Sequence, residues 1–239
     1  MKKSRKKVAL FGGSGSMWYQ AFLELWKRRE REELDIVLLL RPGKKNLDLF
    51  KRWMSKAKCT NKSGKGISVG NGLKIVWGDA TVYEDCVETI KGIDYILCPM
   101  AFISPEADRK PKMAKAVNTD AIKNMIRAVE NEPNGAEHIK FVYVGTVAAT
   151  GDRLPPIHHG RIGDPLKPSV FDYYATTKIA GERALMESKI KHWVSLRQTF
   201  IMVPDVMGLQ DPIMFHQPLN SFMENNTGED AGRGLVNCI

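Results

Sequence analysis

The 239-residue chain has no apolar run approaching the ~20 residues that a bilayer-spanning helix needs. Residues 1–7 are basic, as at the start of a secretory signal, but the apolar run after them stops at Gly12 and Gly13. The sequence therefore predicts no signal peptide and a cytoplasmic location. Its 43% hydrophobic and 26% charged content matches an ordinary globular protein.

Cysteine is scarce, and metal-ligand patterns are missing. The four cysteines show no C-x-x-C spacing: Cys59, Cys86, Cys98 and Cys238. We therefore expect reduced, mostly structural thiols and no metal. His158 and His159 are adjacent, and two neighbouring side chains of an extended chain do not face one point. The pattern favours loop residues over metal ligands or bases and leaves the role of this pair open.

A long basic stripe with interleaved aromatic residues is also missing. The net charge is +9, but five of these charges lie in residues 1–7, which leaves +4 for the rest of the chain. We interpret residues 1–7 as a solvated terminus, and we expect no nucleic-acid or membrane partner.

What is present begins with a glycine-rich turn. An apolar run at residues 8–11 meets this turn, and a long helical pattern follows it. A strand, a glycine turn and a helix together hold a pyrophosphate on backbone N–H groups. Gly12 and Gly15 fit the first two positions of G-x-x-G-x-x-G, whereas Trp18 occupies the third. The sequence therefore predicts a shifted helix or an indole turned aside, with a glycine-rich hairpin turn as the alternative.

Residues 35–40 are nearly all apolar, as expected of a parallel strand covered on both faces. An acidic group at the end of this strand suits NAD, whereas a basic group accommodates the 2′-phosphate of NADP. Asp35 lies at the opposite end of the strand, and Arg41 follows it directly. Arg41, helped by Lys44 or Lys45, favours NADP over NAD; a solvated surface arginine is the alternative.

Strand and helix patterns alternate along the chain. Predicted strands cover residues 8–11, 35–40, 73–77, 94–98, 141–144 and 193–197, with helices that include 47–58, 112–130 and 171–189. Residues 60–72 are predicted to be a loop. The alternation predicts an α/β, Rossmann-type doubly wound parallel sheet with helices on both faces. We predict a dinucleotide-binding domain at residues 1–204 and a partial substrate-binding region, small or truncated, at residues 205–239.

Tyr174 and Lys178 lie four residues apart in the predicted helix, so both side chains project from one helical face. An ammonium beside a phenol lowers the pKa of the tyrosine and yields a proton donor or acceptor for carbonyl chemistry. The alternative is an ordinary helical pair. Among the six tyrosines, only Tyr174 has a lysine at this offset.

Over about residues 6–205 the chain resembles the extended short-chain dehydrogenase/reductase family, which includes NAD-dependent epimerases and dehydratases. The resemblance rests on landmarks in the family's order: Gly12 and Gly15, Gly78-Asp79, Asp94 to Leu97 before Ala101, Val117-Asn118, Thr146 before Gly151, Tyr174 and Lys178 with Gly181-Glu182-Arg183, and Leu196-Arg197.

The resemblance implies a role for each matched residue. Thr146 would hydrogen-bond the substrate oxygen, Tyr174 would transfer the proton, and Lys178 would hold the nicotinamide ribose. Asn118 is the fourth predicted catalytic residue, placed behind the site. The predicted cofactor contacts are Gly12, Ser14, Gly15, Ser16, Met17, Arg41, Asp79, Ala80, Ala101, Tyr174 and Lys178. The alternatives are a helix cap for Asp79, a satisfied buried backbone group for Asn118 and a plain strand end for Thr146.

The chain also departs from the family pattern, since Cys98-Pro99-Met100 replaces the common His-Leu-Ala and Thr150-Gly151 replaces Tyr-Gly. Both departures border the substrate side. We therefore expect an NADP-dependent oxidoreductase that moves a hydride between nicotinamide and a small carbonyl or secondary alcohol compound. The alternatives are a nucleotide-sugar epimerase or dehydratase that retains NAD, and a non-catalytic dinucleotide sensor. The family often dimerises, so a homodimer is open.

Overall fold

The computed structural model describes residues 5–13, 15–151, 163–203 and 224–239. Ser14, His158 and His159 lie outside the described residues. Within the described ranges, no helix combines the length and the hydrophobicity needed to cross a membrane.

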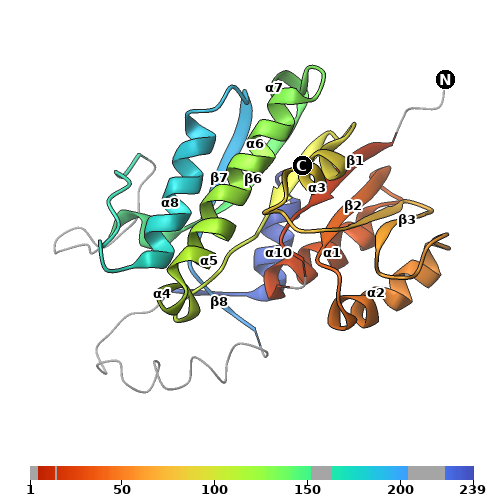
Figure 1. Ribbon diagram of the computed structural model, residues 1–239, viewed down its shortest axis with the longest axis horizontal. Helices are drawn as coiled ribbons and strands as arrows, with labels where there is room; N and C mark the ends of the chain where they lie inside the picture. The colour runs from red at the N-terminus through yellow and green to blue at the C-terminus, as the bar shows by residue number, and fades with distance from the viewer. Residues whose placement is uncertain (1–4, 14, 152–162, 204–223) are drawn as a thin grey trace.

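A seven-stranded sheet lies at the centre of the molecule, in the order β3-β4-β2-β1-β5-β6-β7 (Figure 1). Its strands are β1 (Lys6–Leu10), β2 (Leu34–Leu40), β3 (Gly66–Gly70), β4 (Leu73–Trp77), β5 (Tyr95–Cys98), β6 (Lys140–Thr146) and β7 (His192–Gln198). All neighbours pair in parallel except β3, which is antiparallel to β4. The strand order reverses between β1 and β5, which is where such sheets open a ligand crevice.

Helices cover both faces of this sheet, because successive residues of each strand bury toward opposite sides. In and just after β1, Val8 and Leu10 join one apolar cluster, while Ala9 and Phe11 join the other. The first cluster includes residues of α1 (Ser16–Arg28), α2 (Lys44–Lys56) and α10 (Gly228–Val236). The second includes residues of α3 (Tyr83–Ile90), α6 (Ala121–Asn131) and α8 (Tyr173–Met186). The predicted doubly wound sheet is confirmed.

Shorter elements complete the described chain. They are α4 (Glu106–Arg109), α5 (Pro111–Lys115), the π-helical turn η1 (Ala116–Asp120), α7 (Gly135–His138), the 3₁₀ turn η2 (Val147–Thr150), β8 (Phe200–Met202) and β9 (Asn225–Thr227). The helix predicted at residues 112–130 is confirmed, since α5, η1 and α6 follow one another without a gap and their junction residues keep helical backbone angles. The π-helical turn η1 within it was not predicted.

The loop predicted at residues 60–72 is wrong, because it contains the edge strand β3. This strand buries Ser68, which accepts a hydrogen bond from Trp77 Nε1 at 2.9 Å. Ile67 and Val69 are exposed. The strand thus shows the reverse of the usual apolar-in, polar-out pattern, and glycines bound it at both ends.

The C-terminal helix α10 packs against α1, as Figure 1 shows. Gly232 makes this approach close, since a Cβ there would lie 2.7 Å from the backbone nitrogen of Ala21. The predicted domain boundary at residue 205 falls outside the described residues. The assignment of residues 205–239 to a substrate region therefore stays a prediction.

Candidate active site

The glycine turn after β1 is held by close backbone contacts. Gly12 has a φ of +112°, and a Cβ there would lie 2.9 Å from Met100 Cα. A Cβ on Gly13 would meet Leu40 Cδ2 at 2.8 Å. These two positions therefore require glycine, because the turn touches the segments that follow β2 and β5.

Helix α1 begins directly after this turn. Gly15 is its N-cap residue and has no capping side chain, and the first turn of α1 has no acidic residue. Its backbone N–H groups carry the positive end of the helix dipole. This helix start can therefore receive an anionic group such as a phosphate.

Trp18 turns its indole away from this helix start and into the core. Its side chain is 1% exposed, and its ring centroid lies 5.4 Å from that of Phe50 and 6.0 Å from that of Phe22. Its Nε1 donates to the carbonyl of Leu10 at 3.4 Å. The prediction of an indole turned aside is confirmed, so the missing third glycine does not place a bulky ring in the crevice.

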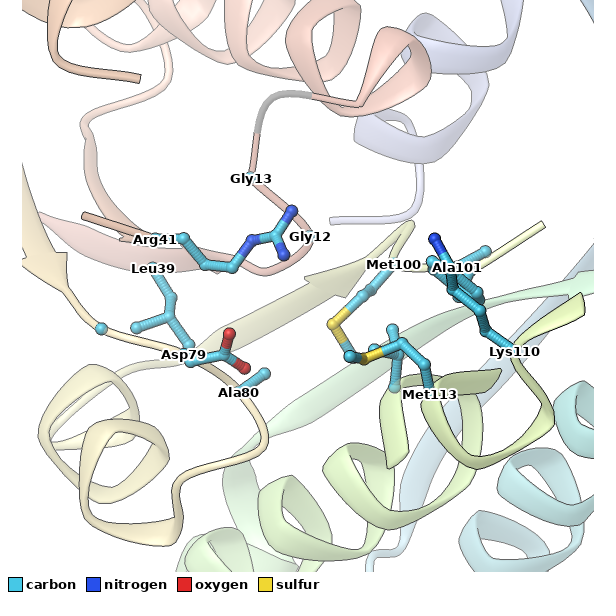
Figure 2. Close-up of a pocket in the computed structure, with 13 residues that line it drawn as sticks. Gly12, Gly13, Leu39, Arg41, Asp79, Ala80, Met100, Ala101, Lys110 and Met113 are labelled. Atoms are coloured by element: carbon cyan, nitrogen blue, oxygen red, sulfur yellow. The ribbon is translucent and has the colours of Figure 1, made fainter. Parts of the chain in front are cut away.

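A cavity of about 240 Å³ lies at the carboxyl ends of the central strands (Figure 2). Its walls come from the turns after β1, β2, β4 and β5 and from the segment around α5. The lining residues are Gly12, Gly13, Leu39, Arg41, Gly78, Asp79, Ala80, Met100, Ala101, Phe102, Lys110, Met113 and Val117. The topology has thus brought together turns that are far apart in the sequence.

The cavity contains part of the predicted cofactor set. Gly12, Arg41, Asp79, Ala80 and Ala101 line it. Gly15, Ser16, Met17, Tyr174 and Lys178 do not line it. These residues lie instead at the start of α1 or on α8.

Arg41 and Asp79 direct their side chains toward the cavity from neighbouring strand ends (Figure 2). Arg41 is exposed, and its guanidinium forms no ion pair with the residues that the structure describes. Asp79 Oδ1 accepts from Thr81 N at 2.9 Å and from Thr81 Oγ1 at 2.8 Å. Asp79 thus stabilises the turn before α3 while facing the cavity. The alternative of a helix cap is wrong, because the N-cap residue of α3 is Val82 and this helix has no side-chain cap hydrogen bond.

Sequence reasoning missed several wall residues: Met100, Phe102, Lys110, Met113 and Val117. Met113 is 48% exposed, although it belongs to a strongly helical stretch. A large apolar side chain on an exposed helix face was the available signal. Lys110 pairs with Glu106 Oε2 at 2.9 Å, and no local pattern pointed to it.

Lys178 is buried behind the cavity wall. Its Nζ donates to the carbonyl of Met100 at 3.1 Å and lies 4.2 Å from the ring centroid of Tyr143. Burial lowers the pKa of this ammonium to about 8, against the opposing influence of Cys98 and Glu182. Lys178 thus reaches a residue that lines the cavity, and its charge is shielded from water.

Tyr174 is half-buried near the start of α8, where Asp172 Oδ1 caps the helix by accepting from Ala175 N at 2.8 Å. Burial raises the pKa of the Tyr174 phenol, and a hydrogen bond with the Thr146 side chain partly opposes this rise. The expected lowering by Lys178 is wrong in this structure, because the ammonium is directed to Met100 and Tyr143 instead.

Asn118 lies within the π-helical turn η1 and is 1% exposed. Its Oδ1 accepts from Phe102 N at 2.7 Å, and its Nδ2 donates to Phe102 O and to Thr177 Oγ1, both at 3.0 Å. Asn118 therefore satisfies buried backbone groups, as the alternative interpretation expected. It is not a wall residue, and its catalytic role stays a prediction.

Metal-binding chemistry has no support in the described part of the chain. No group of three or more His, Cys, Asp or Glu side chains there could hold a metal ion. The four cysteines are free thiols. Burial raises the pKa of Cys98 to about 11 and, with nearby carboxylates, that of Cys86 to about 12, so both remain protonated near neutral pH.

No family model matches the chain, and no curated protein matches its sequence. Solved structures do match. A UDP-N-acetylglucosamine 4-epimerase from Methanobrevibacter ruminantium M1 is 16% identical, with a TM-score of 0.68 over 98% of this chain and 73% of that one. The terminal R domain from the myxalamid PKS-NRPS biosynthetic pathway is 16% identical, with a TM-score of 0.70 over 99% of this chain and 62% of that one. The chain has the Rossmann-type fold of these enzymes.

A dTDP-glucose 4,6-dehydratase from Bacillus anthracis, solved with NAD, has the same fold at 14% identity and a TM-score of 0.68, over 96% of this chain and 70% of that one. The predicted resemblance to extended short-chain dehydrogenases is therefore confirmed at the level of the fold. The chain spans 62% to 73% of the length of these three proteins and 66% of Pen from Bacillus thuringiensis. In this Rossmann-type fold the cavity lies where the strand order reverses, between β1 and β5.

Proposed function

We propose that the chain is an NADP-dependent oxidoreductase that reduces the carbonyl group of a small molecule. The observation that carries this proposal is the hydrogen bond of Thr146 with Tyr174, on the helix that also bears the buried Lys178, whose ammonium contacts the cavity wall at Met100. The phenol and the ammonium come from α8, and the hydroxyl comes from the end of β6. Such a set can protonate and polarise a substrate oxygen.

The residues present fit a dinucleotide. The start of α1, free of acidic residues, suits the pyrophosphate. The close contact between Gly12 and Met100 leaves no room for a side chain between the turn and the wall after β5. Asp79 and Ala80 line the cavity, and the family resemblance implies that Asp79 would contact the adenine. Ala101 would lie beside the ribose.

Three cations support NADP over NAD. Arg41 lines the cavity, and Lys44 and Lys45 follow in the first turn of α2. Cations at a helix N-terminus are disfavoured by the dipole, and the N-cap Gly43 supplies no side-chain hydrogen bond. A 2′-phosphate at this place would offset the repulsion by binding both the cations and the helix N–H groups.

When bound, NADPH supplies the hydride to the carbonyl carbon. Tyr174 donates its proton to the carbonyl oxygen, since its phenol, whose pKa is raised by burial, carries the proton at neutral pH. General acid catalysis of this kind contributes about 10²–10⁴-fold. Thr146 orients the phenol and hydrogen-bonds the same oxygen. Lys178 donates one N–H to Met100 and has two further donors, which would hold the ribose of the bound dinucleotide.

A nucleotide-sugar epimerase or dehydratase is the second candidate, favoured by the fold shared with the UDP-N-acetylglucosamine 4-epimerase and the dTDP-glucose 4,6-dehydratase. Such a reaction begins by oxidising a hydroxyl group, which requires Tyr174 to accept a proton. Arg41 on the cavity wall favours NADP over NAD and so supports net reduction over this candidate.

The test has two stages. The protein is purified under mild conditions, bound dinucleotide is identified by mass spectrometry, and NADPH and NADH are titrated by fluorescence. Ketones and sugar nucleotides are then screened at the nicotinamide absorbance. We expect tighter binding of NADPH and net reduction of a ketone. Co-purified NAD with conversion of a sugar nucleotide would support the second candidate, and failure to bind either dinucleotide would contradict both.

A further inference from the structure

Thr177, directly before Lys178, has a buried hydroxyl with partners on two elements. Its Oγ1 lies 2.8 Å from the carbonyl of Tyr173 and 3.1 Å from that of Tyr174. It also accepts from Asn118 Nδ2 at 3.0 Å. Donation to a preceding carbonyl is common for a helical threonine. The additional bond to Asn118 links the turn that contains Tyr174 to η1.

Asn118 continues this link to the cavity wall. Its amide accepts from the backbone N–H of Phe102 and donates to the backbone carbonyl of the same residue, and Phe102 lines the cavity. A second bond, from Thr119 Oγ1 to the carbonyl of Thr177 at 2.8 Å, fixes η1 against α8. The π-helical form of η1 is a feature often found at functional sites.

Close packing leaves little freedom between these elements. Gly181, one turn along α8, faces the carbonyl of Asn118 so closely that a Cβ would overlap it. Tyr143 donates its hydroxyl proton to the carbonyl of Lys178 at 2.9 Å. The polar groups in this region are buried, so water cannot replace a hydrogen-bond partner that is lost.

We propose that Thr177 is a positioning residue that couples the turn of Tyr174 to the cavity wall at Phe102 through Asn118. The hydroxyl sets the position of the Asn118 amide, and the amide sets the backbone of Phe102. The inference rests on the proposed function, since it assigns the coupled wall to the dinucleotide and the coupled turn to the proton donor.

Thr177→Val keeps the shape of the side chain and removes the hydroxyl. One N–H of Asn118 is then buried without a partner. Such a loss typically shifts the equilibrium between the closed and the locally opened form about tenfold toward the open form. Thr176→Val is a matched control, because Thr176 Oγ1 makes the equivalent bond to the carbonyl of Asp172 at 2.8 Å but is exposed and does not reach Asn118. Thr177→Ser restores the hydroxyl.

The primary measurement is hydrogen exchange at the Phe102 amide, followed by NADPH titration of the same variants. We expect Thr177→Val to speed this exchange about tenfold and to weaken NADPH binding by a similar factor, with Thr176→Val and Thr177→Ser close to wild type. If the valine variant does not fold, Thr177→Ala removes the same hydroxyl with a smaller side chain.

The outcomes separate this inference from the proposed function. Unchanged exchange at Phe102 in a folded Thr177→Val protein would overturn the inference, as would an equal effect of Thr176→Val. If Thr177→Val speeds exchange at the Phe102 amide but the wild-type protein binds no NADPH, the link through Asn118 is supported and the proposed function is overturned. Failure of Thr177→Ser to restore slow exchange would also overturn the inference.

Discussion

Replacement of the buried Lys178 by methionine has a stability effect that can be worked from the structure. The folded-state pKa of about 8 lies below the ordinary value of 10.5 because burial disfavours the charged form. Below pH 8 the folded protein therefore bears a buried charge at a cost of about 3 kcal/mol. Between pH 8 and 10.5 the unfolded chain binds a proton that the folded chain lacks, so stability rises with pH.

Lys178→Met retains the buried stem and removes this titration. The lost hydrogen bond to Met100 offsets about 1 kcal/mol of the gain, which leaves a variant more stable than wild type by about 2 kcal/mol at pH 7. From pH 7 to 9.5 the difference shrinks by about 2 kcal/mol, since wild type alone gains stability from this group.

Urea denaturation of both proteins at pH 7, 8.5 and 9.5 measures the difference, and other titrating groups cancel because they are common to both. We expect the variant to lose activity while it gains stability, as often occurs at functional sites. A difference in unfolding free energy that does not change with pH would refute the reasoning, because it would mean that Lys178 titrates as if exposed.

Two further predictions concern the cavity. Arg41→Ala is expected to weaken NADPH binding about tenfold and to leave NADH binding unchanged, because an exposed cation–phosphate contact contributes on the order of 1.4 kcal/mol. Lys51→Ala is the control, since Lys51 lies on α2 but does not line the cavity. An equal loss of NADPH affinity in this control would show a nonspecific charge effect. Gly12→Ala places a Cβ 2.9 Å from Met100 Cα at a φ of +112°, so we expect thermal destabilisation and loss of dinucleotide binding. Gly234→Ala is the control that should remain stable, because the space around its added Cβ is open. Equal thermal stability of the two variants would contradict the close contact between Gly12 and Met100.

The central sheet could be predicted because its strands are covered on both faces. Residues 36–40 of β2 are all buried, so the sequence there is a continuous apolar run. The edge strand β3 lacks this signal, since it exposes Ile67 and Val69 and buries Ser68. Its pairing with β4 is decided by tertiary contacts, which local sequence patterns do not contain.

The π-helical turn η1 had no local signal either. The apolar positions across residues 112–130 fit an ordinary helix, and the departure from it coincides with contacts from α8, such as the bond from Thr119 to the Thr177 carbonyl. The apolar periodicity therefore does not predict η1, which lies where elements distant in the sequence make contact.

The grouping of the turns that line the cavity could be predicted, because the carboxyl ends of parallel strands meet at one edge of the sheet. Arg41, Asp79 and Ala101 follow three different strands and line one cavity. The direction of the Lys178 side chain could not be predicted. Helical spacing gives only the face, whereas the Met100 carbonyl and the Tyr143 ring determine where the ammonium lies.

The most direct test of the proposed chemistry is the turnover of Tyr174→Phe, measured as NADPH oxidation at the nicotinamide absorbance with a ketone substrate found by screening. The variant keeps the ring and loses the proton. We predict that turnover falls by about 10²–10⁴-fold while NADPH affinity stays within about twofold of wild type. Turnover close to that of wild type would contradict the assignment of Tyr174 as the proton donor.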